Sequence, residues 1–287
     1  MTSGYAALRD RSGVEARHPG HFRTDWRRRA RSIAILALVL ALFAVGIESL
    51  DVSWRRVWGG IGKLGDFVVL TWPPTPATTA RALLFAKGLA ESVAIAFLGT
   101  LVAAILAFPF AILAAKNVIP NMFVHFAARR ALDSIRAIDT LIWALIWVGV
   151  VGLGPFAGIL AIACADFGVF GKLFSEAIES TERGSVEGVR STGGSKAQAV
   201  RFGLLPQVLP VVASQVLYLF ESNTRSATII GIVGAGGIGL YLSELIRTLE
   251  WQAVAFVVLM ILVTVAAIDF VSSRLRFAMI GGQPSAG

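Results

Sequence analysis

The chain has 287 residues, of which 56% are hydrophobic and 15% are charged, and its formal net charge at pH 7 is +8. Soluble domains carry about 25% charged residues. This composition, with a mean hydropathy of +0.73, therefore excludes an ordinary soluble domain and indicates an all-α, polytopic integral membrane protein. The single cysteine, Cys164, excludes an intrachain disulfide, and the three histidines form no metal-binding motif. We expect no metal site and no nucleic-acid partner, and we expect the lipid bilayer as the surroundings.

The N-terminal region is polar and Arg-rich, and the apolar run Ile33–Ile47 follows it. A basic stretch before an apolar one also fits a cleaved signal peptide. Against that alternative, the basic region is long and no clear Ala-x-Ala site follows. We predict a cytoplasmic tail over residues 1–32 and a retained first transmembrane helix over residues 33–50. Residues 51–89 contain three tryptophans and are predicted to form an external amphipathic segment at the membrane interface.

Five more apolar stretches predict further transmembrane helices within residues 90–272, and residues 273–287 are predicted to form a second cytoplasmic tail. Two of the stretches are shorter than the ~20 residues of a crossing and are expected to extend into flanking polar residues. With six spans and both termini inside, most Lys and Arg residues lie on the cytoplasmic side, as the positive-inside rule requires. The stretches are Val93–Ala115, Leu141–Leu153, Phe156–Phe174, Val208–Phe220 and Val254–Val271.

Residues 226–243 are uncharged but rich in glycine, and each glycine weakens a helix by up to ~1 kcal/mol. Counting this stretch as a seventh span would place Arg274 and Arg276 outside. We therefore expect an irregular or re-entrant segment in the outer half of the membrane, where protein or a water-filled cavity satisfies its backbone.

Gly234–Gly239 within this stretch matches the GxGxxG dinucleotide fingerprint, and Thr228–Val233 before it has the composition of a strand. The match would indicate a different class of function, a membrane-bound oxidoreductase in which Glu250 is the acidic residue that binds the ribose of the nucleotide. However, a nucleotide-binding unit needs further alternating strands and helices, and the neighbours here are membrane spans. Close helix packing or a flexible gate explains the glycines better. No GxxxxGK[ST] sequence occurs, so another chain must do any work that requires ATP.

A polar, charged stretch between the fourth and fifth spans is the most informative part of the chain. Its pattern predicts a short helix, a glycine break and a second short helix, and such a unit can insert into a partner's groove and transmit motion. The alternative is a solvated amphipathic loop without a partner, and the residues alone do not separate the two. The predicted order is a helix over residues 185–191 that contains Glu187, a break at Gly193-Gly194, a helix over Lys196–Phe202, and a stop at Leu205-Pro206.

This stretch resembles the EAA coupling loop of binding-protein-dependent ABC transporter permeases. The family pattern is Glu-Ala-Ala, three residues, Gly, nine residues and Ile-x-Leu-Pro. Glu187 and Gly193 keep their places, whereas Gly203 replaces the isoleucine, and Gly188 and Val189 replace the alanines. The wider run from Glu91 to Phe270, about two-thirds of the chain, is similar to the phosphonate permease subgroup. The supporting pieces are Trp143–Ile146, Val151–Gly158, Gly171–Glu179 and Glu221–Thr228.

The resemblance implies a type I ABC importer permease fold of about six transmembrane helices in the cell membrane of a prokaryote. It implies no catalysis and no cofactor on this chain. The implied partners are a second copy of the chain, two cytoplasmic ABC ATPase subunits and an external phosphonate- or phosphate-binding protein. A permease of the same fold for another small solute, or a secondary transporter without ATPase subunits, is the alternative. The implied contacts with the ATPase are Glu187, Gly188, Val189, Gly193, Arg201, Leu205 and Pro206.

Asp166 lies inside the predicted fourth span, where the subgroup is expected to have a neutral or His side chain. Exposing an ionisable group to lipid costs at least ~2.5 kcal/mol, so Asp166 is either functional or paired inside the bundle. Because the spans carry no relay of Asp, Glu and His side chains beyond Asp166, proton coupling is not favoured.

A polar cluster follows the fifth apolar run, and we expect it at the outer end of that span. Arg225 would attract an anion and Glu221 would pair with it; the alternative is an interfacial cap with a local salt bridge. Together with the glycine segment, the cluster is interpreted as the translocation path and outer gate. The predicted residues are Glu221, Asn223, Thr224, Arg225, Gly234, Gly236, Gly237 and Gly239.

Overall fold

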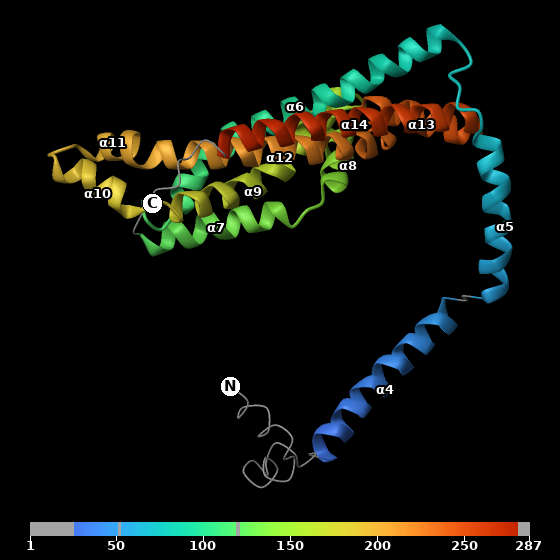
Figure 1. Cartoon of the computed structure of the whole chain (residues 1–287), viewed down its shortest axis with the longest axis horizontal. Helices are drawn as coiled ribbons and strands as arrows, with labels where there is room; N and C mark the ends of the chain where they lie inside the picture. Colours follow the sequence, from blue (N-terminus) through green and yellow to red (C-terminus); the bar gives the residue numbers. More distant parts are fainter. Residues whose placement is uncertain (1–25, 51–52, 119–120, 281–287) are drawn as a thin grey trace, which may run out of the picture. The chain divides into compact units, whose positions relative to one another are not determined.

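The computed structural model describes residues 26–50, 53–118 and 121–280, and every regular element in these ranges is a helix (Figure 1). The chain divides into two compact units, residues 1–67 and 68–287. The first unit holds α4 (Trp26–Ser49), whose apolar side chains are exposed and which is long enough to cross a membrane. Most of the predicted N-terminal tail, residues 1–25, lies outside the described residues. α5 (Trp54–Thr71), which runs across the boundary, lies in the stretch predicted to be amphipathic.

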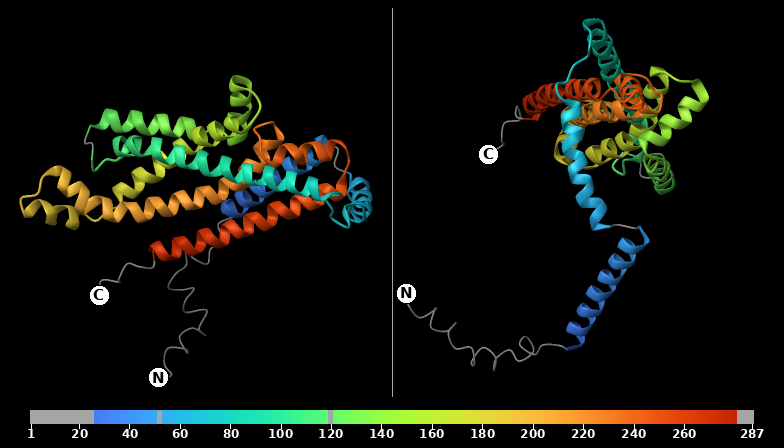
Figure 2. Two further views of the ribbon diagram at one scale, coloured as in Figure 1. Left: turned by 90° about the horizontal axis from the view of Figure 1, so that it is seen from above. Right: turned by 90° about the vertical axis from the view of Figure 1, so that its right-hand side faces the viewer.

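The second unit is a bundle of long helices that run roughly side by side (Figure 2). At one end, Arg81 near the start of α6 pairs with Glu250 just before α14 at 2.7 Å. At the other end, Lys116 after α6 donates its backbone N–H to Glu179 at the end of α9. We call these the α13 end and the coupling-loop end. The four long helices are α6 (Thr79–Ala114), α9 (Pro155–Glu179), α12 (Leu205–Ile232) and α14 (Trp251–Ile280).

Together with α4, these helices give five described elements that are long and apolar enough to cross a membrane, in line with the sequence prediction. A sixth crossing requires the pair α7 (Met122–Arg136) and α8 (Thr140–Val151), which is bent by 82° at its break. Asp139 explains the break, because its carboxylate accepts the backbone N–H of Leu141 at 2.8 Å and starts α8 anew. The third apolar run therefore does not extend as one straight helix, and it reaches the length of a crossing only together with α7 in this bent pair.

Small residues let the central helices of this unit approach closely. Ala103, Ala107 and Ala111 of α6 are fully buried, and a Cβ at Gly99 would lie 2.7 Å from the Cβ of Ile162 in α9. A Cβ at Gly168 of α9 would lie 2.7 Å from a backbone oxygen of α7. Close packing of small residues is the usual way in which membrane helices associate. It fixes α9 at the centre of the unit.

α12 extends beyond its apolar run into the polar residues on either side, as the sequence analysis expected for this short stretch. The hydrophobic stretch stops at Phe220, but the helix continues without interruption to Ile232. It can continue because Glu221, Asn223 and Thr224 are buried and hydrogen-bonded or paired inside the protein. The placement of this polar cluster at the outer end of a span was wrong, since the cluster lies inside α12. The strand-like reading of Thr228–Val233 was also wrong, because Ile232 is still helical.

A short glycine turn joins α12 to α13 (Ile238–Arg247), which has 10 residues and is too short to cross a membrane. The backbone N–H of Ala235 donates to the carbonyl of Ile230 at 3.2 Å and closes the end of α12. Gly234, Gly236 and Gly237 have φ angles of +97°, +83° and +74°, which glycine adopts without strain. The irregular backbone is thus confined to this turn, and most of residues 226–243 is helical.

Candidate functional site: the coupling loop, the polar interior and the glycine turn

The predicted coupling loop is a projecting helical hairpin at the coupling-loop end. Gly193 has a φ of +84° in its turn, and Ser195 then caps the second arm. The capping is reciprocal: Ser195 Oγ accepts the Gln198 N–H at 3.3 Å, and Gln198 Oε1 accepts the Ser195 N–H at 2.8 Å. The predicted helix, break and second helix are confirmed. The elements are α10 (Arg183–Ser191), α11 (Lys196–Gln198) and the π-helical turn η1 (Ala199–Leu204).

The sequence analysis predicted that the second arm stops at Leu205-Pro206, and this prediction was wrong. η1 runs directly into α12, and the backbone N–H of Leu205 donates to the carbonyl of Val200, five residues earlier. The wider π turn accommodates Pro206, which has no N–H to offer to the helix. The second arm and α12 therefore form one continuous helical element.

The structure explains why position 203 is glycine, where the family pattern has isoleucine. A Cβ at Gly203 would lie 2.9 Å from the Cα of Val186 and 3.1 Å from the carbonyl oxygen of Ser185. The two arms of the hairpin therefore touch backbone to backbone at this point. Gln207 ties them together further, because its amide donates to the Gly203 carbonyl at 2.7 Å and accepts the Glu182 N–H at 3.1 Å. The close contact of the two arms thus leaves no room for a side chain at position 203.

Most of the predicted contact residues lie on the outside of the hairpin. Glu187, Gly188, Gly193 and Arg201 are exposed, and Val189 is half-buried. Leu205 and Pro206 lie at the root, where the hairpin joins α12. The structure thus brings the predicted contact residues together on one projection.

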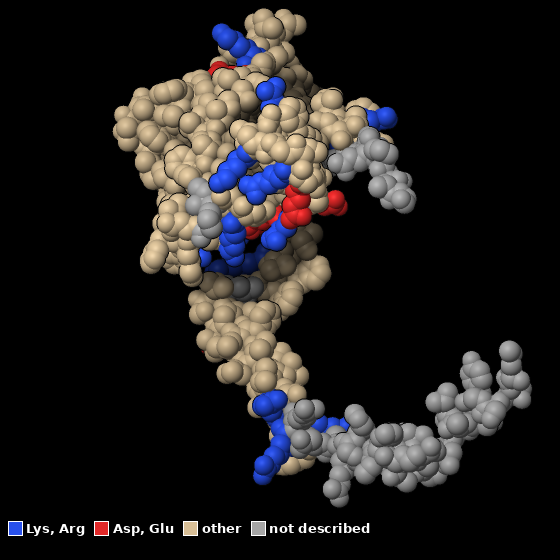
Figure 3. All heavy atoms as spheres, turned by 90° about the vertical axis from the view of Figure 1, so that its left-hand side faces the viewer, with Lys and Arg blue, Asp and Glu red and all other residues tan. Residues whose placement is uncertain are grey.

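A cleft of about 520 Å³ lies between the hairpin and the connection that follows α6. Figure 3 shows basic side chains gathered on this end of the unit, with a small acidic group beside them. The cleft therefore presents positive charge to whatever seats against it. Its charged lining residues are Lys116, Arg183, Glu187, Arg190 and Lys196.

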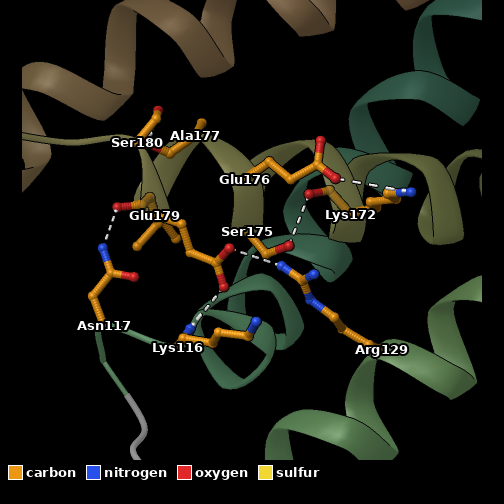
Figure 4. A network of polar contacts seen from close by, with 10 residues as sticks. Lys116, Asn117, Arg129, Lys172, Ser175, Glu176, Ala177, Glu179 and Ser180 are labelled. Carbon is orange, nitrogen blue, oxygen red and sulfur yellow. Dashed lines mark hydrogen bonds and ion pairs between the residues drawn. The ribbon is translucent and has the colours of Figure 1, made fainter.

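Glu179 anchors the base of the hairpin, and sequence reasoning did not single it out. One carboxylate oxygen accepts a hydrogen bond from the Lys116 backbone N–H at 2.9 Å, and the other accepts one from Arg129 Nη2 at 2.9 Å (Figure 4). Asn117 also donates its amide to the carbonyl of Ile178 at 2.9 Å. These contacts join the ends of α6, α7 and α9 just before α10 begins. The only sequence signal was an acidic residue at the end of a span among basic ones.

Asp166 is paired inside the bundle. The side-chain amide of Asn223 donates to Asp166 Oδ2 and to Thr100 Oγ1, the latter at 2.8 Å. Thr100 in turn donates its hydroxyl to the carbonyl of Ala96 at 2.7 Å. All three side chains are buried, so the amide links α6, α9 and α12 through polar contacts shielded from lipid. This contact set is the polar pair that the sequence analysis kept as an alternative.

Glu221 pairs with Arg225, as expected, and with a second arginine that was not expected. Glu221 Oε1 lies 3.5 Å from Arg225 Nη1, and Glu221 Oε2 lies 3.1 Å from Arg276 Nη2 of α14. The carboxylate is buried, with a side-chain exposure of 10%. Sequence reasoning placed Arg276 in a cytoplasmic tail, but α14 continues past it to Ile280. One carboxylate therefore joins α12 to α14 through two guanidinium groups.

The glycine turn packs against the start of α9 and against α6. The N–H of Gly237 donates to Glu91 Oε1 at 3.2 Å, and the N–H of Ile238 donates to Ser92 Oγ at 2.9 Å. Gly234 accepts the Gly154 N–H at 2.9 Å. The turn follows a helix and faces the carboxylate of Glu91, which is the wrong surrounding for a pyrophosphate. The two predicted gate groups also lie apart, since the turn is beyond the end of α12 and Glu221 is inside it.

The family described as binding-protein-dependent transport system inner membrane component matches residues 107–279, more than half of the chain. The chain belongs to this family. It is therefore a transport permease of an inner membrane and not an enzyme. The match runs from the last turns of α6 into α14, so it includes the coupling loop, Asp166, Asn223 and the glycine turn.

Several permeases are similar over most of the chain. HtxC of Stutzerimonas stutzeri is 39% identical over 256 residues, which are 89% of this chain and 90% of HtxC. PtxC of the same species, named a phosphite transport system permease protein, is 33% identical over 257 residues, or 89% of this chain and 91% of PtxC. PhnE of Mycolicibacterium smegmatis, named a phosphate-import permease protein, is 40% identical over 191 residues, or 67% of this chain and 36% of PhnE.

A solved structure confirms the fold. A chain of the inward-facing MetNI methionine ABC transporter has a TM-score of 0.62 and 20% sequence identity. The similarity covers 70% of this permease and 99% of that chain. The expected type I importer permease fold is therefore confirmed.

Proposed function

We propose that this permease forms the translocation pathway of an ATP-driven importer for a phosphorus oxyanion, namely a phosphonate, phosphite or phosphate. The observation that carries the proposal is its similarity, over nearly its whole length, to a permease named for phosphite. A second relative named for phosphate import supports the same class of substrate. These anions share a tetrahedral phosphorus with negatively charged oxygens, so one pathway can suit all three.

The coupling loop is the proposed contact with a cytoplasmic ATPase subunit, which would bind ATP and Mg. The exposed Glu187, Gly188 and Gly193 support this assignment, because they project beyond the bundle on one rigid hairpin. The basic cleft beside the hairpin could receive an acidic part of the ATPase. Because the hairpin is continuous with α12, a displacement of the loop would move α12 as a lever.

Two copies of the permease are proposed to enclose the pathway, with the coupling-loop end in the cytoplasm and both termini on that side. The concentration of Lys and Arg at the coupling-loop end supports this orientation. The α13 end would then receive the external binding protein. The glycine turn, Gly234–Gly239, is the proposed outer gate, and the Asp166–Asn223 contact is proposed to hold α12 in place beside it.

Substrate-dependent ATP hydrolysis tests the proposal. The permease is purified together with the ATPase and the binding protein encoded beside it, and the complex is placed in lipid nanodiscs. Binding protein loaded with phosphite, phosphate or methylphosphonate is expected to raise the rate of ATP hydrolysis. Binding protein without ligand, or offered methionine, serves as the control. If none of the three anions stimulates hydrolysis but another solute does, the substrate class is wrong.

A further inference from the structure

One face of α12 is left uncovered by the rest of the unit. Seven residues recur along the helix at alternating steps of four and three, which places them on one stripe. Five of them are exposed and two are half-buried, and none is part of the described core. We call this set the α12 stripe. Its members are Val211, Gln215, Tyr218, Ser222, Arg225, Ile229 and Ile232.

The α12 stripe is apolar at its two ends and polar in its middle. Val211 begins the stripe and Ile229 and Ile232 end it, whereas the middle carries an amide, two hydroxyls and the Arg225 guanidinium. Arg225 lies seven residues before the end of α12, about 10 Å along the axis, and α13 continues beyond. An arginine facing lipid inside a span costs at least ~2.5 kcal/mol. The middle of the stripe therefore requires water or protein in front of it.

The charges at this place do not cancel. Glu221 is the shared partner of Arg225 and Arg276, so the cluster of three side chains carries one excess positive charge. Arg225 is also the more accessible guanidinium, with a side-chain exposure of 51% against 22% for Arg276. Arg276 is held beside the stripe, since its Cζ lies 5.8 Å from the ring centroid of Tyr218. An excess positive charge on a water-facing stripe is complementary to an anion.

We propose that Arg225, supported by Arg276 and Tyr218, forms a transit site for the phosphorus oxyanion on the α12 stripe. The inference rests on the proposed function, because it requires that such an anion passes through the permease. A guanidinium fork matches two oxygens of a tetrahedral oxyanion and binds them with charge-assisted hydrogen bonds. Glu221 competes with the anion for the same forks, which keeps binding weak enough for release.

A second copy of the permease would complete the site. The four–three spacing of the α12 stripe is the spacing by which two helices pack side by side. If two stripes face each other across the pathway, two Arg225 guanidiniums approach one another and repel unless an anion or water lies between them. The apolar ends of the stripe then pack together while the polar middle stays open. The arrangement suits a path that is closed above and below a central anion.

The first arm of the test measures import. The complex with its ATPase and binding protein is reconstituted in vesicles, and uptake of labelled inorganic phosphate and phosphite is recorded. Arg225→Gln is expected to lower uptake by at least about tenfold, the effect of losing a charge-assisted hydrogen bond to the anion. Arg225→Lys keeps the positive charge but loses the two-pronged guanidinium, so its uptake rate should lie between those of Arg225→Gln and the unmodified complex. Arg130→Gln changes an exposed arginine of α7, outside the stripe and the coupling hairpin, and should match the unmodified complex.

The second arm separates a transit site from a purely structural ion pair. Glu221→Gln releases both guanidiniums, so the complex without binding protein should bind inorganic phosphate several-fold more tightly, yet import it more slowly. Arg225→Gln added to Glu221→Gln should remove the gain in binding. A structural pair would weaken assembly and give no such gain. All variants are compared by co-purification with the ATPase, which confirms that the complexes are assembled.

The outcomes distinguish the two proposals. If the unmodified complex imports neither phosphate, phosphite nor methylphosphonate, the proposed function is wrong. If the unmodified complex imports one of them and Arg225→Gln imports it equally well, only the transit site is wrong. An unchanged phosphate affinity in Glu221→Gln also overturns the transit site.

Discussion

Replacing Gly236 with valine is expected to abolish import while the permease still assembles with its ATPase. Gly236 has a φ of +83°, which a β-branched residue adopts only with strain of ~1–3 kcal/mol. A Cβ there would also lie 2.7 Å from the backbone N and 2.9 Å from the Cα of Pro155, and this neighbour cannot rotate away. The turn must therefore shift, and with it the contacts of Gly237 and Ile238 with α6.

Import into vesicles that contain the ATPase and the binding protein measures this effect. Gly149→Val is the matched control, because Gly149 is an exposed helical glycine with no atom within 4 Å of an added Cβ. The control should import at the unmodified rate. Unmodified import by Gly236→Val would show that the glycine turn only fills space, and the gate assignment would then be withdrawn.

Gly193→Pro is expected to remove the coupling between ATP hydrolysis and import. Proline fixes φ near −65°, whereas Gly193 requires +84°, so the hairpin cannot keep its turn. No atom lies within 4 Å of an added Cβ, and the residue is exposed, so the change acts on the hairpin backbone and not on the bundle. The Asn223 and Glu179 contacts, which lie in and at the base of the bundle, should persist.

The measurement compares import and the stimulation of ATP hydrolysis by loaded binding protein. Gly184→Pro serves as the control, since Gly184 lies in the first turn of α10, where proline is tolerated. It should retain most of both activities. If Gly193→Pro keeps normal stimulated hydrolysis and normal import, the hairpin is not the coupling element.

The parts of the fold that follow from local pattern were predictable from the sequence. Long apolar runs located α6, α9 and α14, because a membrane crossing requires ~20 apolar residues. The break of the coupling hairpin followed from Gly193-Gly194, because glycine permits the left-handed turn. Both predictions depend only on residues that are neighbours in the chain.

The errors arose where distant residues decide the outcome. α12 runs through Glu221–Arg225 because α14 supplies Arg276 and α6 and α9 supply Thr100 and Asp166, none of which is near in sequence. A hydropathy profile counts such buried polar residues as the end of a span. The bend before α8 depended likewise on a single capping carboxylate, which an apolar count does not register.

The candidate site was likewise predictable from the sequence only where the residues involved are neighbours in the chain. The spacing from Glu187 to Leu205-Pro206 located the coupling hairpin, but the reason for Gly203 became visible only when the backbone of Val186 was found against it. Glu221 and Arg225, one helical turn apart, were correctly expected to pair. Arg276, the third side chain of this ion-pair cluster, lies 55 residues after Glu221 in the chain, so no local sequence pattern predicted the contact.

ATP-driven import into vesicles is the most direct test of the proposed function. Vesicles that contain the permease and its ATPase, with ATP inside and binding protein outside, are offered labelled phosphite, phosphate and methylphosphonate. At least one of these anions is expected to accumulate against its gradient, and accumulation is expected to stop when ATP, the ATPase or the binding protein is left out. Accumulation that persists without ATP and the ATPase, or accumulation of none of the three anions by an assembled complex, would contradict the proposed function.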